Sequence, residues 1–188
     1  MKESLKQLIN YITKFEKSEL DTIAVCFQPQ SVKRNTLLLH AGEVCREFYF
    51  VHKGCIRTYF LDRKGTEKTR LVMTDFSIGT ALTSFISQKP SFEFVEALDD
   101  SEILAISHEN FYRINQEIDH WKVFYQRILE MAYSFQNRKI EGLVTLTAKQ
   151  RYDQLLKESP HLVQRLSNRV LASYLDIEPE TLSRLKSK

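Results

Sequence analysis

Within the segment Glu180-Thr-Leu-Ser-Arg184 near the end of the chain, Glu180, Ser183 and Arg184 have side chains that can hydrogen-bond nucleic acid bases. An arginine can donate two hydrogen bonds to the major-groove edge of guanine, and a glutamate can accept one from cytosine. Glu180 and Arg184 are four residues apart, so a helix would place them one turn apart on the same face. The segment therefore predicts a base-reading helix, to which Ser183 adds a weaker contact.

The residues before this segment have the spacing of a helix-turn-helix. Ala172 is small, as is required where two crossing helices come close together. Asp176 follows four residues later, and aspartate tolerates the left-handed backbone that a tight turn can require. Leu182 is the apolar residue contributed by the second helix, and Pro179 suits its first turn. The small core is completed by Leu171, Leu175, Ile177 and Leu185.

Positive charge is concentrated in the same region. Residues 147–188 contain eight Lys/Arg and five Asp/Glu, an excess of +3 that equals the net charge of the chain, while the other 146 residues carry 19 of each sign. Such an excess suits a surface that faces phosphates, and it is also compatible with a solvated helical face. The residues expected to contact DNA are Glu180, Thr181, Ser183, Arg184, Lys186, Lys188 and Arg169.

Residues 36–106 have a different pattern, in which short runs rich in Phe, Tyr and Val alternate with turns. Four of the five glycines in the chain, at positions 42, 54, 65 and 79, lie in this region. Arg63-Lys-Gly65 between two alternating runs is typical of a hairpin turn. Strands this short and this regularly spaced predict an antiparallel barrel or jelly roll. The predicted strands are 36–40, 47–51, 55–61, 68–73, 92–97 and 102–106.

Helices are predicted on both sides of this β-region. Residues 3–16 form a short amphipathic helix, and Ser107 can cap the helix that follows the last strand. Within residues 118–140, large apolar residues recur with the heptad spacing of a coiled-coil seam. Either the β-region of the same chain or an identical helix from a second copy must cover this seam, and both can hold on different faces of the helix. We expect a parallel homodimer, because a two-fold DNA reader needs a symmetric interface. The predicted dimer residues are Trp121, Phe124, Ile128, Met131 and Phe135.

Capping signals divide the C-terminal region. Thr147-Ala-Lys-Gln150 is a capping box, and Ser167 can cap the first helix of the helix-turn-helix. The interval between Pro160 and Ser167 is too short for a β-hairpin. We therefore expect no β-hairpin wing beside the reading helix.

Other classes of protein have little support. Cys26, Cys45 and Cys55 have no CxxC spacing, and we expect reduced, partly buried thiols. The five histidines include no H-x-H pair of a metal-binding cupin, and haem ligation by one of them stays open without support. No nucleophile elbow, P-loop or catalytic carboxylate pair is present. We expect no enzymatic activity, metal or cofactor, and no membrane-spanning segment or signal peptide, which predicts a cytoplasmic protein.

The order of these elements resembles the Crp/Fnr family of bacterial transcription regulators. The resemblance extends from about Leu5 to Lys188 and is strongest in residues 171–186 and in Leu39-His-Ala-Gly-Glu-Val-Cys-Arg-Glu-Phe-Tyr-Phe-Val-His-Lys-Gly-Cys55. The chain is similar to the short members that are common in Bacteroidetes. The resemblance implies that Glu180, Ser183 and Arg184 match the base-contacting residues of the oxygen-sensing branch, with a TTGA-like half-site. Pro179 stands where the cyclic-AMP branch has an additional arginine.

The resemblance also implies an effector pocket in the β-region. In family members that bind cyclic nucleotides, a Gly-Glu pair holds the ribose, and an arginine that follows a proline clamps the cyclic phosphate. Gly79 and Pro90 match this pattern, but Thr80 replaces the acid and Ser91 replaces the arginine; Ala81 completes the expected pocket. Loss of the guanidinium removes a charge-assisted bond worth ~1.5–3 kcal/mol. We therefore expect a degenerate pocket that binds another ligand or none.

The sequence thus predicts an α+β fold in three parts. Residues 5–116 form an antiparallel β-roll of the jelly-roll, cyclic-nucleotide-binding type, 117–146 a dimerisation helix, and 147–188 a helix-turn-helix domain. The predicted function is that of a homodimeric transcription regulator that binds an inverted-repeat operator in double-stranded DNA, with RNA polymerase as a further partner and an unknown small-molecule effector. The alternative is a ligand-sensing β-roll that acts through protein partners and retains a vestigial DNA-binding domain, which the missing wing and the modest basic charge support.

Overall fold

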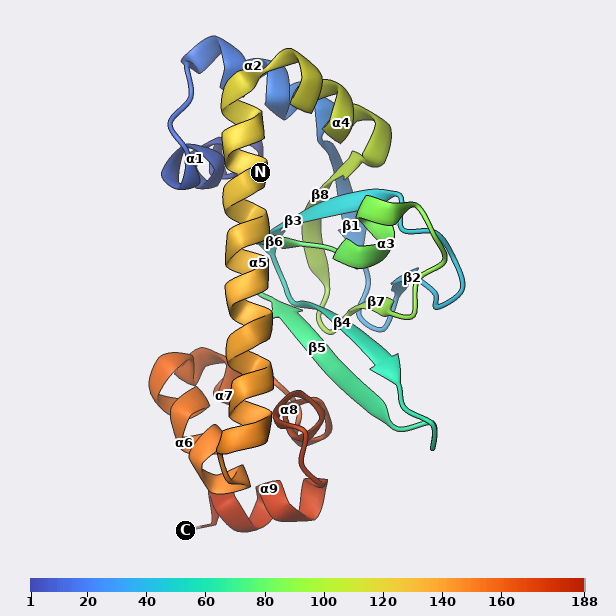
Figure 1. The fold of residues 1–188 in the computed structure, drawn as a ribbon, viewed down its shortest axis with the longest axis vertical. Coiled ribbons are helices and arrows are strands. Elements are labelled where there is room, and N and C mark those ends of the chain that lie inside the picture. Colours follow the sequence, from blue (N-terminus) through green and yellow to red (C-terminus); the bar gives the residue numbers. More distant parts are fainter. Residues whose placement is uncertain (188) are drawn as a thin grey trace. The chain divides into compact units, whose positions relative to one another are not determined.

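The computed structural model describes residues 1–187 (Figure 1). Its strands are β1 (Gln28–Val32), β2 (Leu37–Leu39), β3 (Glu47–Lys53), β4 (Ile56–Leu61), β5 (Glu67–Met73), β6 (Ser77–Gly79), β7 (Phe94–Ala97) and β8 (Ser101–Ser107). Its helices are α1 (Lys2–Ile12), α2 (Lys17–Cys26), α3 (Leu82–Ser87), α4 (His108–Glu117), α5 (Asp119–Thr145), α6 (Ala148–Glu158), α7 (Pro160–Arg165), α8 (Asn168–Leu175) and α9 (Pro179–Lys186).

These elements form two compact units. The first unit comprises residues 1–60 and 71–129, and the second comprises residues 61–70 together with the chain from 130 onward. The strands make two four-stranded sheets with the orders β1-β8-β3-β6 and β2-β7-β4-β5. The strand pairs are antiparallel, as between Phe48 and Ile106 in β3 and β8. The predicted α+β class with an antiparallel β-roll is therefore confirmed.

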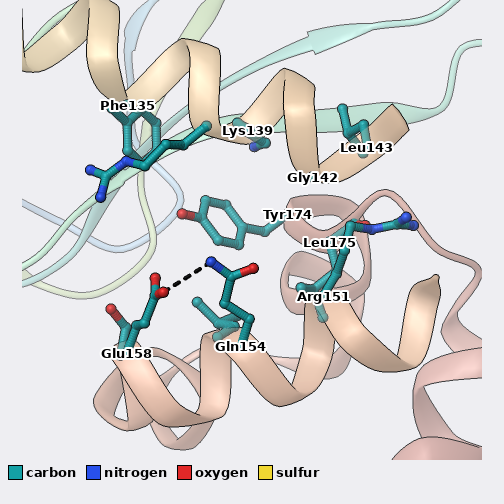
Figure 2. Close-up of a pocket in the computed structure, with 12 residues that line it drawn as sticks. Phe135, Lys139, Gly142, Leu143, Arg151, Gln154, Glu158, Tyr174 and Leu175 are labelled. Atoms are coloured by element: carbon teal, nitrogen blue, oxygen red, sulfur yellow. Dashed lines mark hydrogen bonds between the residues drawn. The ribbon is translucent and has the colours of Figure 1, made fainter. Parts of the chain in front are cut away.

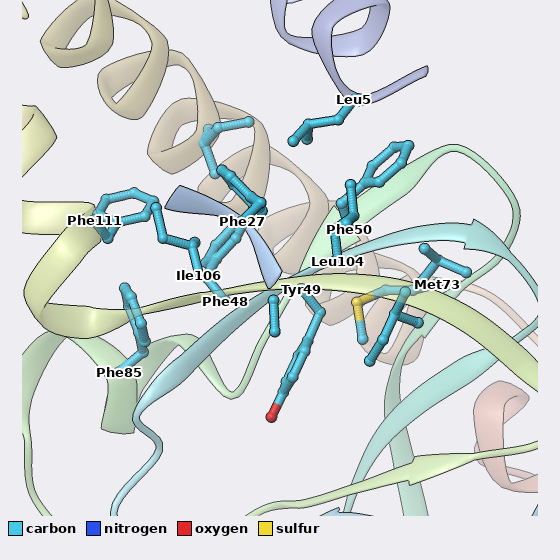
Figure 3. Packing of buried hydrophobic residues seen from close by; sticks show 14 of the residues in the cluster. Leu5, Phe27, Phe48, Tyr49, Phe50, Met73, Phe85, Leu104, Ile106 and Phe111 are labelled. Atoms are coloured by element: carbon cyan, nitrogen blue, oxygen red, sulfur yellow. The ribbon is translucent and has the colours of Figure 1, made fainter. Parts of the chain in front are cut away.

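The core of the first unit is rich in aromatic residues (Figure 3). Phe48, Phe85 and Phe111 are buried, with ring centroids 5.3–5.7 Å apart. Burial of a side chain of this size stabilises a fold by about 1.5–3 kcal/mol. The aromatic runs of the sequence therefore supply the interior of the β-roll.

The N-terminal segment differs from its prediction. The helix expected over residues 3–16 ends at Ile12, because Thr13 is extended and the Asn10 side chain accepts a hydrogen bond from the amide of Phe15 at 3.0 Å. A second helix, α2, follows, and Glu16 and Glu19 close a capping box at its start. The short elements β1, β6, α3 and α7 were also absent from the prediction. Apolar periodicity gives little signal in segments of three to six residues.

Helix α5 lies within the predicted range 117–146 but buries part of the face that was expected to form the dimer seam. Trp121, Phe124 and Ile128 are buried in the core of the first unit, where the Trp121 ring lies 4.7 Å from that of Phe124 and 5.1 Å from that of Phe111. These three side chains cover the β-roll of their own chain. The predicted dimer seam is therefore corrected at these positions, whereas Met131 is exposed and Phe135 is half-buried.

The structure describes the cysteines, the possible metal ligands and the hydropathy of the helices within residues 1–187. Cys26, Cys45 and Cys55 are buried free thiols, as predicted. Within residues 1–187, no three His, Cys, Asp or Glu side chains gather in a way that could hold a metal ion. None of the described helices has the length and apolar character that crossing a membrane requires.

Candidate nucleic-acid interface

Helix α8 is the first helix of the predicted pair. The Ser167 side chain accepts a hydrogen bond from the amide of Val170 and caps the helix, as predicted. Such a cap stabilises a helix by about 1 kcal/mol. Leu171, Ala172 and Leu175 are buried on one side of α8, and Leu182 of α9 is fully buried as well. These contacts make up the small core that the spacing predicts.

The turn between the two helices depends on Asp176. Its backbone is left-handed, with φ 52° and ψ 52°. The amide of Ile177 donates to the carbonyl oxygen of Ala172 at 3.0 Å, the long hydrogen bond that ends a helix in a Schellman motif. The chain then enters α9 with Pro179 in the first turn. The predicted turn chemistry is confirmed at both residues.

Helix α9 exposes the side chains that the sequence assigns to base reading. Glu180, Ser183, Arg184 and Lys186 are exposed, and Thr181 is half-buried. Glu180 lies in the first turn and the two cations in the last turn, which favours the helix dipole at both ends. The helix therefore presents one acceptor and two cations on a surface that its own unit leaves open. Lys188 lies outside the described residues.

Two of the predicted phosphate contacts already have partners within the unit. Arg169 forms a 2.8 Å ion pair with Glu67 of β5, and Lys186 donates to the side chain of Asn168 at 2.7 Å. The Arg169 side chain is nonetheless exposed, and exposed ion pairs contribute only about 0–1 kcal/mol. A phosphate could therefore replace either partner at low energetic cost.

Within the second unit, hydrogen bonds of Ser173 join α8 to β5. The Ser173 hydroxyl donates to the carbonyl oxygen of Glu67 at 2.8 Å and accepts from the amide of Thr69 at 2.8 Å. The Thr69 hydroxyl lies 2.9 Å away from it. One donor and two lone pairs are all that a hydroxyl has, so Ser173 uses its full capacity on this strand.

Lys139 of α5 binds the same strand. Its ammonium group donates to the carbonyl oxygens of Thr69 and Arg70, at 2.7 and 3.0 Å, and lies 4.3 Å from the centre of the Tyr174 ring. Burial lowers the pKa of Lys139 to about 8. A further ion pair joins Lys68 of β5 to Asp176. Residues 67–70 are thus held by side chains from α5 and α8.

Three of the five predicted effector residues, Thr80, Ala81 and Ser91, are buried within the β-roll, whereas Gly79 is half-buried and Pro90 is exposed. The Thr80 hydroxyl donates to the carbonyl oxygen of Glu47 at 2.6 Å, and the Cys45 thiol lies 3.0 Å from it. The Ser91 hydroxyl donates to the carbonyl oxygen of Glu93 and accepts from the same residue's amide. Ala81 is fully buried. Burial raises the pKa of Cys45, so this thiol stays neutral.

The space beside Gly79 is also filled. A Cβ atom at this position would lie 2.7 Å from the sulfur of Met73 and 3.1 Å from a methyl group of Leu71. Pro90, at the other end of the predicted cassette, forms an isolated bridge with Val44. The cassette residues therefore lie in one region of the β-roll, with apolar side chains against Gly79.

Sequence reasoning missed several residues that matter in this arrangement. Ser173 and Lys139 contact β5 across 104 and 70 residues of sequence, and no local pattern marks them. The buried ion pair between Arg57 and Glu96 joins two paired strand positions, and its guanidinium lies 4.1 Å from the centre of the Tyr59 ring. Opposite charges on two strands indicate an ion pair only once the register of the strands is known.

Comparison with known families identifies the β-roll. Residues 29–117 match the family described as Cyclic nucleotide-binding domain. A search of curated proteins returned no significant match.

Solved structures resemble the whole chain. The catabolite activator protein of Thermus thermophilus is 18% identical with a TM-score of 0.63, over 96% of this chain and 85% of that chain. The global regulator CLP of Xanthomonas campestris, described as c-di-GMP responsive, is 16% identical with a TM-score of 0.72, over 92% and 90%. A regulator from Eubacterium rectale assigned to the crp/fnr family is 21% identical with a TM-score of 0.71, over 91% and 82%. The chain therefore has the fold of these solved structures, and its residues 29–117 match the cyclic nucleotide-binding domain family.

The link between α8 and β5 predicts the effect of Ser173→Ala. The substitution removes the acceptor of the buried Thr69 amide, so this amide should exchange with solvent about 5–30 times faster, which corresponds to ~1–2 kcal/mol. Hydrogen exchange followed by NMR measures it. Ser183→Ala, at an exposed position of α9, is the matched control and should leave Thr69 unchanged. Wild-type protection of Thr69 in Ser173→Ala would contradict this role.

Proposed function

We propose that the protein is a sequence-specific DNA-binding transcription regulator. The observation that carries the proposal is α9, where Glu180, Ser183 and Arg184 are exposed while Leu182 anchors the helix in its own unit. Arg184 can bind guanine through two hydrogen bonds, and Glu180 can accept from cytosine one turn earlier. Lys186 and Arg169 lie where cations can bind phosphates. Thr181 adds a half-buried hydroxyl to the same surface.

We further propose that the protein acts as a homodimer on an inverted repeat. Tyr133, Ile140 and Val144 of α5 are 70%, 58% and 80% exposed. Positions 133, 140 and 144 lie within about 40° of one another around a helix of 3.6 residues per turn. An apolar stripe of this kind favours pairing with a second copy of the same helix. Two reading helices related by a two-fold axis then require half-sites ~10–10.5 bp apart.

Residues 5–116 serve in this proposal as a sensor domain, residues 117–146 as the dimerisation helix and residues 147–188 as the DNA-binding domain. The sensor domain does not use cyclic AMP. Support comes from Thr80 and Ser91, whose hydroxyls bond to the β-roll backbone and carry no charge for a cyclic phosphate. The expected location is the cytoplasm, with RNA polymerase as a further partner.

Two substitutions in α9 separate base reading from phosphate binding. Arg184→Ala should weaken operator binding by ~1–3 kcal/mol per half-site and relax the preference for G·C, because it removes a bidentate contact to guanine. Lys186→Ala should weaken binding to all sequences alike. It should also reduce the slope of log K against log salt concentration by about one per subunit. Fluorescence anisotropy titrations at several salt concentrations measure both. Equal losses on specific and random DNA for Arg184→Ala would argue against base reading by this residue.

The dimer face is tested by two sets of substitutions in α5. Ile140→Glu combined with Val144→Glu should yield monomers, because charges would be buried between two helices. Met131→Glu changes an exposed residue of the face that the sequence predicted, and it should leave the dimer intact. Sedimentation velocity measures the masses. If Met131→Glu breaks the dimer and the double substitution does not, the result would contradict this face and support the seam predicted from the sequence.

The sensor proposal predicts the outcome of a titration with cyclic AMP. Calorimetry should detect no binding at concentrations on the order of tens of micromolar, since the charge-assisted contacts to the cyclic phosphate are missing. A dissociation constant of about a few micromolar would contradict the proposal.

A further inference from the structure

A cavity that opens to solvent lies in the second unit, lined by α5, α6 and α8, and has a volume of about 250 Å³. Figure 2 shows Lys139, Gly142 and Leu143 on α5, Gln154 and Glu158 on α6, and the Tyr174 ring between the two helices. Ligand pockets for drug-sized molecules usually measure about 300–1,000 Å³. The cavity therefore has room for a small molecule of one or two fused rings.

Gly142 keeps this cavity open. A glycine inside a helix is less favourable than an alanine, because it loses more backbone freedom on folding. No close approach requires it here, because a Cβ atom would have only a methyl group of Leu146 within 4 Å, at an ordinary 3.8 Å. Gly142 does line the cavity, so a long side chain at this position would extend into it. Helix α5 thus has a residue with poor helix propensity at position 142, and the structural consequence of this glycine is free space in the cavity.

The cavity wall carries more positive than negative charge. Arg138, Lys139 and Arg151 line it, against one acid, Glu158, which accepts a hydrogen bond from Gln154 at 2.9 Å. Lys139 and Arg151 use backbone carbonyl oxygens as acceptors, and neither forms an ion pair with a carboxylate among the described residues. Charge complementarity therefore favours an anion.

Aromatic rings define the remaining chemistry of the wall. Tyr174 and Phe135 line the cavity, and the ammonium group of Lys139 lies 4.3 Å from the centre of the Tyr174 ring. A flat apolar body can stack against such rings while its charged end reaches the cations. We propose that the cavity binds a small aromatic carboxylate, which places its carboxylate near Lys139 and Arg138 and its ring beside Tyr174.

The position of the cavity gives this ligand a regulatory consequence. Its wall includes Tyr174 and Leu175, the last two residues of α8 before the Asp176 turn. A bound ligand would brace α8 against α5 and α6 and so change the stability of the helix-turn-helix. This consequence for DNA rests on the proposed function, whereas binding of the ligand does not.

The experiment uses the full chain and 2-naphthoate as the probe. Calorimetry should give a dissociation constant on the order of 0.1–1 mM, and the neutral analogue 2-naphthalenemethanol should bind at least ~10-fold more weakly. Gly142→Leu should abolish binding by filling the cavity. Gly142→Ala is the matched control, because it removes the same glycine and leaves most of the space. Arg138→Gln, which changes an exposed side chain, should weaken binding several-fold.

Thermal unfolding establishes that each variant is folded before it is titrated. Absence of naphthoate binding by the wild type, equal binding of the acid and the alcohol, or unchanged binding by Gly142→Leu would overturn the proposal. Operator affinity is measured in separate titrations with and without naphthoate. A failure of DNA binding would therefore count against the proposed function, and a failure of the calorimetric experiment against this site.

Discussion

The outer edge of β5 is the constraint on which the arrangement of the second unit depends. β5 ends the sheet order β2-β7-β4-β5, so one side of this strand has no strand partner in its sheet. Thr69 is buried there, and a buried amide or carbonyl group without a partner costs about 1–3 kcal/mol. The hydroxyl of Ser173 and the ammonium of Lys139 meet this demand in place of a neighbouring strand. An edge covered in this way is also protected from pairing with other chains.

This arrangement determines which side chains of the helix-turn-helix are exposed. Ser173 of α8 faces β5. The other side of the small helical core is formed by α9, whose polar side chains are exposed. Glu67 pairs with Arg169, so in the proposed complex with DNA a phosphate would compete with this carboxylate for the guanidinium. Because the Arg169 side chain is exposed, this ion pair contributes little energy, and through it residues 61–70 would influence the proposed DNA surface.

Sequence reasoning succeeded where the determinants are local. The caps at Ser107, Thr147 and Ser167 and the left-handed Asp176 depend on neighbouring residues, and the structure has each of them. Sequence reasoning failed where the role of an apolar helix face depends on which part of the molecule covers that face. Heptad spacing in α5 identified an apolar stripe, but the β-roll of the same chain, rather than a second copy, covers Trp121 and Phe124. The roles of Ser173 and Lys139 needed the position of the β5 edge, which no spacing along the chain reveals. The base-reading role of the exposed α9 residues stays a prediction.

The central claim, that α9 reads bases as one half of a two-fold reader, is tested most directly by selection of binding sites from random duplex DNA. The wild type should select an inverted repeat with G·C pairs in each half-site and centres ~10–10.5 bp apart. Arg184→Ala should keep the symmetry and spacing of that repeat and lose the preference for G·C. A consensus without two-fold symmetry, or one that Arg184→Ala leaves unchanged, would contradict the account.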